Sequence, residues 1–187
     1  MKRFMLLAVV VISVACCGVP HSEGAEGGET LVAYFSWGGN TESVAKIVAE
    51  MTGGKLFRIT PETPYTRDYD KVVDLAKAEQ NRNARPALAA HVDNMDQYGT
   101  VFLGYPCWWG TLPMAVFTFL EESDLSGKRV IPFVTHGGSG FGRSLNDLRR
   151  LAPNSKIEDG LSVYDTNVSN SRSQVKTWLE SNGIATR

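Results

Sequence analysis

The sequence predicts an α/β fold of three layers, in which a doubly wound parallel sheet of five strands lies between helices on its two faces. Two observations lead to this prediction. Five short apolar runs suit strands that are buried on both faces, and the stretches that separate them carry apolar residues at helical spacing. Strands that alternate with helices in this way close a parallel sheet through right-handed crossovers.

The apolar runs mark the expected strands. The fourth run contains Pro132, which has no N–H to donate to a ladder, so we expect a bulge there or a later start of the strand. The expected strands are Leu31–Phe35, Leu56–Ile59, Val101–Tyr105, Val130–Thr135 and Leu161–Asp165.

Each strand is followed by a helix with one apolar face. Asn40 or Thr41 is expected to cap the first helix, and Pro113 lies where the first turn of the third helix tolerates proline. The side chains on these faces are expected in the core. They are Val44, Ile47, Val48 and Met51; Val72, Val73 and Ala76; Val116, Phe119 and Leu120; Leu145, Leu148 and Leu151; and Val175, Trp178 and Leu179.

The composition is that of a soluble globular protein, with 187 residues, 43% of them hydrophobic, 21% charged and a net charge of −1. Basic residues are interspersed with acidic ones, which argues against a nucleic-acid partner, because such proteins gather Lys and Arg against phosphates. No His/Cys cluster suits a metal. Cys107 is the one cysteine expected in the folded part, so a disulfide framework is not expected.

Residues 1–25 are predicted to be a signal peptide and flexible tether, and residues 30–187 the folded domain. Lys2 and Arg3 precede an apolar stretch, residues 4–14, of the length of a signal-peptide core. This stretch is too short for a membrane-spanning helix. An uncleaved N-terminal anchor is the alternative.

Two forms of processing stay open for this segment. Small residues at positions 13–15 suit ordinary cleavage after Ala15, and they also resemble a degenerate lipobox, in which Cys16 would be lipidated. The polar and Gly-rich residues 21–29 are typical of a flexible tether.

Ligands of doubly wound sheets bind beyond the carboxyl ends of the strands where strand order reverses, and the glycines concentrate in those loops. The first loop, SWGGNT, leads directly into a helix, whose free N–H groups and dipole suit a phosphate. Gly38 and Gly39 let the backbone curl round it, and the side chains of Ser36, Asn40 and Thr41 add donors. The absence of lysine separates this loop from a nucleoside-triphosphate loop. An ordinary Gly-rich turn is the alternative.

The second loop, YPCWWGTLP, follows the third strand. Neighbouring side chains at a strand end diverge, so Trp108 and Trp109 cannot both point into the core. At least one is expected to face solvent or a planar ligand on which an indole can stack. The alternative is a tryptophan pair that plugs the junction of helix and sheet, and Cys107 is expected to pack rather than to act as a redox thiol.

The third loop, THGGSGFGRS, follows the fourth strand. So many glycines favour a close approach of backbone to ligand, whose polar ring edge the N–H groups can bind. His136 is expected either to add a side-chain contact or to be a satisfied structural residue.

Together the three loops resemble those of the flavodoxin-like family, in particular bacterial members with a WWG loop and a GGSG loop. The resemblance covers residues 30–183 and implies a flavodoxin-like fold with strand order 2-1-3-4-5 and one FMN bound without covalent attachment. It implies phosphate contacts from Ser36, Gly38, Gly39, Asn40 and Thr41. It implies isoalloxazine contacts from Pro106, Cys107, Trp108, Trp109 and Gly110 on one side and His136, Gly137, Gly138, Ser139 and Gly140 on the other.

Two features depart from the family. Gly38 stands where a Ser or Thr is usual, which removes a hydroxyl donor, and the strongly acidic surface of typical flavodoxins is missing. We also hypothesise that the peptide between Trp109 and Gly110 lies near flavin N5 and shifts the one-electron potential.

Three functions are open at this point. The first is an FMN-dependent oxidoreductase that passes electrons from NAD(P)H or another donor to a quinone-like acceptor. The second is a flavodoxin-type electron carrier that serves a protein partner. The third is a non-redox protein that binds a phosphate ligand. The resemblance and the leader imply export from a bacterial cytoplasm, as a periplasmic protein or a membrane-anchored lipoprotein.

The connection from Thr60 to Tyr98 holds one predicted helix and is far longer than a median loop. A solvated crossover is the favoured interpretation. A lid or partner surface is the alternative, with the following candidates: Tyr65, Tyr69, Arg82 and Arg85.

Overall fold

The structure, a computed structural model, describes residues 28–187. The predicted leader and Cys16 lie outside these residues, so their processing stays a prediction. Glu29, which the sequence assigned to the tether, is instead the first residue of strand β1 (Glu29–Tyr34) and pairs with Tyr98. The ordered sheet therefore begins slightly earlier than expected.

The strands form one parallel sheet of order β2-β1-β3-β4-β5, with β6 also paired to β4, which confirms the predicted order. The remaining strands are β2 Lys55–Arg58, β3 Tyr98–Pro106, β4 Arg129–His136, β5 Lys156–Ile157 and β6 Leu161–Tyr164. The helices are α1 Asn40–Thr52, α2 Tyr69–Asn81, α3 Met114–Glu122, α4 Ser144–Leu151 and α5 Arg172–Ser181, with short 3-10 helices at Met95–Gln97 and Asp165–Asn170. None of the helices within residues 28–187 is long and apolar enough to cross a membrane.

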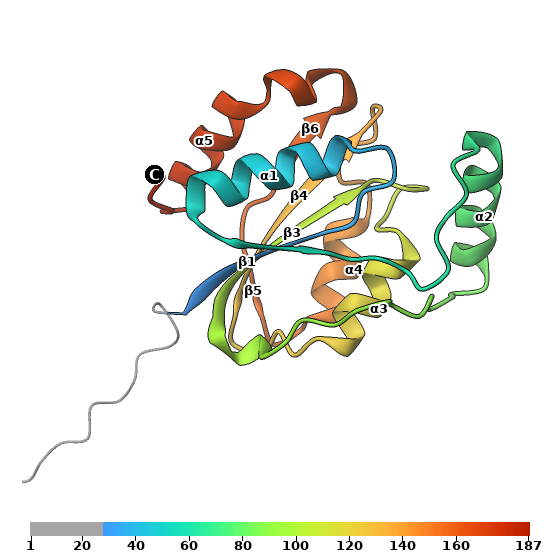
Figure 1. Ribbon diagram of the computed structural model, residues 1–187, viewed down its shortest axis with the longest axis horizontal. Coiled ribbons are helices and arrows are strands. Elements are labelled where there is room, and N and C mark those ends of the chain that lie inside the picture. The colour runs from blue at the N-terminus through green and yellow to red at the C-terminus, as the bar shows by residue number, and fades with distance from the viewer. Residues whose placement is uncertain (1–27) are drawn as a thin grey trace, which may run out of the picture.

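The sheet separates two hydrophobic cores, because successive side chains of a strand point to opposite faces. Figure 1 shows α1 and α5 on one face and α3 and α4 on the other. Val32 and Tyr34 of β1 pack into the first core, whereas Leu31 and Ala33 pack into the second. Burial on both faces explains why the strands read as continuous apolar runs.

Pro132 causes no bulge, contrary to the expectation. It lies inside β4, buried, and opposite Leu103 in an unbroken register with β3. The interruption is instead in the fifth strand, which is divided into β5 and β6. Residues 158–160 lie between these strands and outside their ladder with β4, although the Glu158 N–H still donates to the Val130 carbonyl at 3.0 Å. Proline has no N–H to offer this neighbour, and a Cβ on Gly160 would approach the Pro132 carbonyl oxygen to 3.0 Å.

The predicted caps were wrong in detail. Gly39, in the left-handed conformation at φ 95°, is the N-cap of α1, and neither Asn40 nor Thr41 makes a side-chain cap. The Ser43 hydroxyl donates back to the Gly39 carbonyl at 3.0 Å. Pro113 is the N-cap of α3, just before its first turn.

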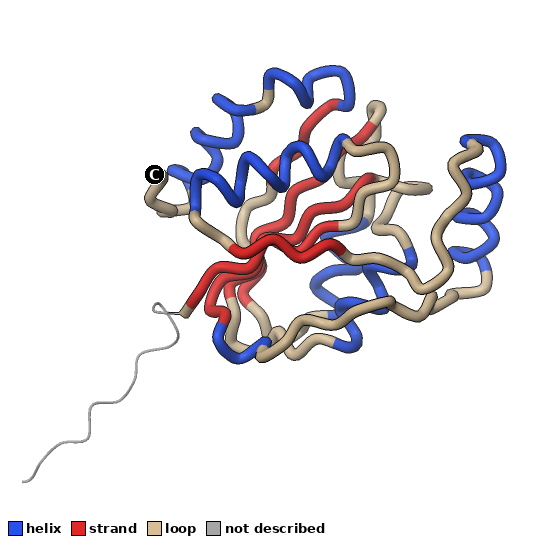
Figure 2. Tube along the Cα trace, viewed as in Figure 1, coloured by secondary structure: helices blue, strands red, loops and turns tan. Residues whose placement is uncertain are grey.

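The long connection between β2 and β3 carries α2, which stands at the carboxyl edge of the sheet, apart from the two helix layers (Figure 1). After α2 the chain returns past α3 as a loop (Figure 2). Arg85 of this loop is bound to Glu121 of α3 through an Nε–Oε2 distance of 2.6 Å. The connection is thus a crossover whose helix α2 stands beside the carboxyl edge of the sheet.

Candidate functional site

The three glycine-rich loops leave the same edge of the sheet. Tyr34 of β1 lies opposite Gly104 of β3, and Pro106 of β3 lies opposite Thr135 of β4. The Cys107 N–H continues this pairing by donating to the Thr135 carbonyl at 2.9 Å. The loops after β1, β3 and β4 therefore start side by side, as the site requires.

The candidate phosphate loop, residues 36–41, is held in place by hydrogen bonds with buried hydroxyl groups. Ser36 Oγ accepts the Gly39 N–H at 3.2 Å. The Oγ1 atoms of Thr41 and Thr135 lie 2.8 Å apart in a buried hydrogen bond that joins the first loop to β4. Because its hydroxyl is already bound to Thr135, Thr41 stabilises the loop rather than offering that hydroxyl to a ligand.

The space around the two glycines of this loop, Gly38 and Gly39, is open. A Cβ added at Gly38 or Gly39 would meet nothing within 4 Å, and Asn40 is exposed. The first turn of α1 has N–H groups without intrahelical acceptors, at the positive end of the helix dipole. Backbone donors that converge on open space at a helix start are suited to an anion.

Arg58, at the end of β2, adds a cation beside this loop and was missed from the sequence. Its Nη2 donates to the Ser36 carbonyl at 2.9 Å, and its Nη1 lies 2.6 Å from Glu42 Oε2. The pKa of Glu42 is lowered, first by a hydrogen bond from Lys46 and further by Arg58. The signal was available, because a parallel β2 must end at the same edge as β1.

The WWG segment forms a tight turn. The Trp108 N–H donates to the Thr111 carbonyl at 2.9 Å, and the Thr111 N–H donates back at 3.1 Å. Between them Trp109 and Gly110 both have positive φ, at 51° and 76°. A bulky residue rarely adopts such a φ, so the surrounding contacts must hold Trp109 in place.

Those contacts come from α2. Trp109 Nε1 donates to the Val73 carbonyl at 3.0 Å, and the Trp109 carbonyl accepts from Gln80 Nε2 at 3.2 Å. Lys77 Nζ lies 4.9 Å from the centroid of the Trp109 ring, a cation–π distance. With 47% of its surface exposed, Trp109 is the tryptophan that faces outward.

Trp108 turns inward instead, and its ring packs edge-on against Phe35 and Tyr65, with centroids 5.3 Å away in both cases. Tyr65 is fixed in turn by a 2.6 Å hydrogen bond from its hydroxyl to the buried Glu79. The pKa of Tyr65 is raised, first by burial and then by this bond. Trp108 thus packs at the edge of the hydrophobic core, whereas Trp109 lies at the surface.

Aromatic side chains from three segments line a cavity of about 270 Å³ between α2 and the WWG turn. Trp37 of the first loop and Tyr69 of α2 are among the lining residues, with ring centroids 6.2 Å apart. The Trp37 Nε1 donates to the Thr66 carbonyl at 2.7 Å, so its polar atom is satisfied and its ring is free to contact a ligand. Cys107 is a half-buried free thiol that also lines this cavity.

The GGSG loop lies directly against the WWG turn. The Arg143 N–H donates to the Gly110 carbonyl at 2.8 Å, and a Cβ on Gly142 would collide with that same carbonyl. Gly137, Gly138 and Ser139 are exposed beyond this contact. The structure therefore brings the two loops together through backbone, while the indole of Trp109 is directed to α2.

Asp147 of α4 ties the WWG turn to the second helix layer. Its Oδ2 accepts from Thr111 Oγ1 at 2.6 Å, and Arg143 and Arg150 also bind the carboxylate. Burial alone would raise the pKa of Asp147, but these hydrogen bonds outweigh it and the pKa is lowered.

His136 has no free ring nitrogen. Its Nδ1 accepts the Gly138 N–H at 2.9 Å, and its Nε2 lies 2.8 Å from Ser162 Oγ. Of the two roles expected from the sequence, the geometry therefore favours a satisfied structural residue that shapes the loop.

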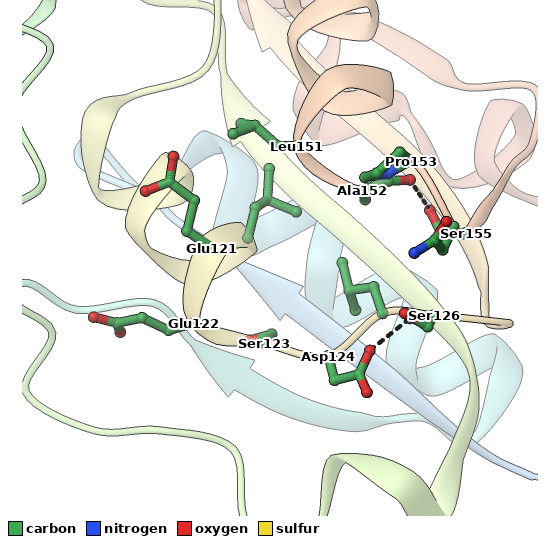
Figure 3. A pocket seen from close by; sticks show the side chains of 12 residues that line it. Glu121, Glu122, Ser123, Asp124, Ser126, Leu151, Ala152, Pro153 and Ser155 are labelled. Atoms are coloured by element: carbon green, nitrogen blue, oxygen red, sulfur yellow. Dashed lines mark hydrogen bonds between the residues drawn. The ribbon is translucent and has the colours of Figure 1, made fainter.

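A larger cavity, about 510 Å³, lies at the opposite end of the sheet, where α3 and α4 end (Figure 3). It is lined by leucine and proline side chains as well as acidic and hydroxyl ones, and some of its polar groups bind one another, as Ser155 Oγ does with the Ala152 carbonyl at 2.8 Å. Ligands of doubly wound sheets bind at the carboxyl edge, so volume alone does not make this cavity the site. Within residues 28–187 no three His, Cys, Asp or Glu side chains are grouped to hold a metal ion.

The residues at the carboxyl edge fit the parts of an FMN molecule. The open first loop suits its monoester phosphate, and the exposed backbone of the GGSG loop suits the polar edge of its ring. Aromatic surface for the ring is supplied by Trp109 and its neighbours. Gly110 has room for a Cβ, so nothing in the turn blocks a ligand there.

A family model described as Flavodoxin matches residues 29–182. None of the curated proteins matches the chain at a significant level. Many solved structures are similar, including the following three. Proteins assigned as flavoproteins from Bacteroides eggerthii and Bacteroides uniformis are each 34% identical to this chain. The match to the first covers 82% of this chain and 97% of that protein, with a TM-score of 0.73. The match to the second covers 83% and 99%, with a TM-score of 0.74. A flavoprotein from Lactobacillus acidophilus in complex with FMN shares the fold, with 22% identity, coverage of 77% and 98%, and a TM-score of 0.64. The chain therefore belongs to the flavodoxin family.

Proposed function

We propose that this protein is an FMN-binding redox protein that passes electrons from NAD(P)H or another donor to a quinone-like acceptor. FMN is the cofactor that membership of the family supports. The observation that carries the proposal is the placement of an open, lysine-free phosphate loop beside an exposed Trp109 at the switch point of the sheet. A site for phosphate alone would leave this aromatic surface without a role.

The chain's own residues bind and orient the cofactor. The backbone of residues 37–41 and the Asn40 amide receive the phosphate, while Ser36 and Thr41 keep the loop in shape through their hydroxyl groups. Bound FMN supplies the redox chemistry, and the protein tunes it.

The peptide between Trp109 and Gly110 is the expected tuning group. Its carbonyl is held by Gln80 of α2, and a trans peptide points its N–H to the side opposite its carbonyl. The Gly110 N–H is therefore directed away from α2. An N–H near flavin N5 can donate a hydrogen bond to that nitrogen only while the nitrogen is unprotonated. Because α2 orients this N–H, α2 is expected to bias the redox potential of the bound flavin.

One feature favours an enzyme over an electron carrier. The cavity between α2 and the WWG turn lies next to the expected flavin edge and is mainly apolar, with Trp37 and Tyr69 in its lining. Planar apolar acceptors suit such a lining. The charge of the chain, −1 overall, gives little support to electrostatic docking on a basic redox partner.

The absorption spectrum of the purified protein is the first test. A bound flavin supports the proposal, whereas a protein that neither purifies with flavin nor binds added FMN contradicts it. Steady-state oxidation of NADH or NADPH with a quinone acceptor, compared with simple cytochrome reduction, then divides the enzyme from the carrier. A carrier reduces the cytochrome through a reductase partner and shows no saturable quinone dependence.

We also propose that the protein acts outside the bacterial cytoplasm, as a periplasmic protein or a lipoprotein anchored through Cys16. The support is the leader-like sequence of residues 1–25. The mass of the mature N-terminus tests this, because a diacylglyceryl cysteine, a chain that begins at Cys16 without lipid and an unprocessed chain differ in mass.

A further inference from the structure

His136 joins the GGSG loop to β6 through both of its ring nitrogens. It is the last residue of β4, and its Nδ1 accepts the N–H of Gly138, two residues further on, at 2.9 Å. The ring thus closes a side-chain turn of the kind that Asn and Asp make. On the other side, Nε2 lies 2.8 Å from Ser162 Oγ.

This pair of contacts selects one form of the ring. Because Nδ1 accepts a hydrogen bond, it carries no proton, so the proton of the neutral imidazole is on Nε2 and is donated to Ser162. A protonated ring would carry a hydrogen on Nδ1 that faces the Gly138 N–H. Two donors cannot bond each other, so the turn would open.

We propose that His136 is a positioning residue, whose neutral ring holds Gly138 and its neighbours in the shape that binds the flavin ring and whose protonation releases them. The inference rests on the proposed function and adds a regulation of that site: acid weakens FMN binding. Gly138, at φ 140°, has a backbone conformation that only glycine adopts readily. The loop therefore depends on this side-chain contact for its shape.

The groups that face the ring come from β6 and the segment after it. The Tyr164 ring packs edge-on against His136 with centroids 5.3 Å apart, and its hydroxyl donates to the Gly137 carbonyl at 2.9 Å. Asp165 brings a carboxylate near the loop, with Oδ2 3.8 Å from where a Gly137 Cβ would lie.

The test is the affinity for riboflavin and FMN between pH 5 and 8, the range in which histidines change charge. Riboflavin is needed because the FMN phosphate also takes up a proton in this range. For the wild type we expect riboflavin affinity to fall about 2- to 12-fold toward pH 5, which is the value of one net hydrogen bond. His136→Asn keeps an acceptor at the Nδ1 position that does not titrate, and its affinity is expected to be flat with pH.

Two further variants complete the design. His136→Phe removes the acceptor and should bind weakly at every pH, and His91→Asn changes an exposed histidine that faces Glu122 at the other end of the sheet and should behave as wild type. A pH profile that is flat in the wild type, or that persists in His136→Asn, overturns the proposal.

A measurement without cofactor separates this inference from the proposed function. In the FMN-free protein, the ¹⁵N shift of His136 Nδ1 should show an unprotonated nitrogen at pH 7.5. The protection factor of the Gly138 amide, which is its exchange rate relative to the intrinsic rate at each pH, should fall as that nitrogen takes up a proton. Failure of the protein to bind any flavin refutes the proposed function. A protonated Nδ1 at pH 7.5, or a Gly138 protection factor that does not fall as Nδ1 takes up a proton, refutes the positioning role.

Discussion

Gly142 is the position where a single methyl group should separate the WWG turn from the GGSG loop. Its φ is 54°, in the left-handed region, and a Cβ would collide with the Gly110 carbonyl that accepts the Arg143 N–H. Gly142→Ala therefore imposes two costs, one from the backbone conformation and one from the contact between the loops.

The conformational cost of a non-glycine residue at this φ is about 1 to 2 kcal/mol. Loss of the Arg143 hydrogen bond adds about 0.5 to 1.5 kcal/mol. We therefore expect Gly142→Ala to lower the free energy of unfolding by about 1.5 to 3.5 kcal/mol. Displacement of the GGSG loop should also weaken FMN binding by about tenfold, which corresponds to 1.4 kcal/mol.

Gly127 provides the matched control. It has a φ of 73°, close to that of Gly142, but a Cβ there would meet nothing within 4 Å, and it lies in the loop before β4, away from the site. Gly127→Ala should lose only the conformational term, about 1 to 2 kcal/mol, and should bind FMN as wild type does.

The assays are urea unfolding of the cofactor-free proteins and fluorescence titration of FMN. The measured quantity is the difference between the two variants, which cancels the shared backbone strain. Equal losses of stability together with an unchanged FMN affinity in Gly142→Ala would refute the conclusion that contact between these loops shapes the site.

Three further predictions concern the phosphate loop, the exposed tryptophan and the free energy of unfolding at low pH. Gly38→Ser restores the missing hydroxyl at a position without positive φ and with open space around it. FMN affinity should therefore rise about 2- to 12-fold. A lower affinity in the titration would contradict the conclusion that the space at Gly38 is open to the phosphate. Trp109→Ala removes an aromatic surface worth about 0.5 to 1.5 kcal/mol, so FMN affinity should fall about 2- to 12-fold while riboflavin is affected equally; a loss confined to FMN would contradict a ring contact. The pKa of Asp147 is lowered in the folded state, so its stabilising effect is present at neutral pH and is lost as pH falls below about 4. Asp147→Asn should therefore lower the free energy of unfolding at pH 7 by about 1 to 2 kcal/mol, and the difference from wild type should shrink in acid; a difference that is the same at pH 3 and pH 7 in urea unfolding would contradict the ion pairing.

The strand positions were predictable because burial on both faces leaves a strong local signal. Val101 to Tyr105 form one apolar run, and the structure extends that strand only outward, to Tyr98 and Pro106. The division of the fifth strand was less accessible. It depends on which strand lies beside Pro132, and pairing across a sheet is not encoded in the spacing of a single segment.

Prediction of the site was uneven for a similar reason. The three loops could be named because their glycines are local in sequence and parallel strands end at one edge. Arg58, Tyr65 and Gln80 were not recognised as neighbours of these loops, although Tyr65 was named as a lid candidate. They reach the site from β2 and from the connection around α2, and only the path of that connection places them there.

The sequence by itself determined the fold class and the three loops, because each rests on residues that are adjacent in the chain. The strand order followed only from the family resemblance that those loops carry. The tertiary structure alone decided how those loops meet: Trp109 turned to α2, Gly110 against the GGSG loop, and His136 tied to Gly138 and Ser162. These outcomes depend on distances between segments far apart in sequence, which hydrogen-bond geometry and packing select only once the whole chain has folded.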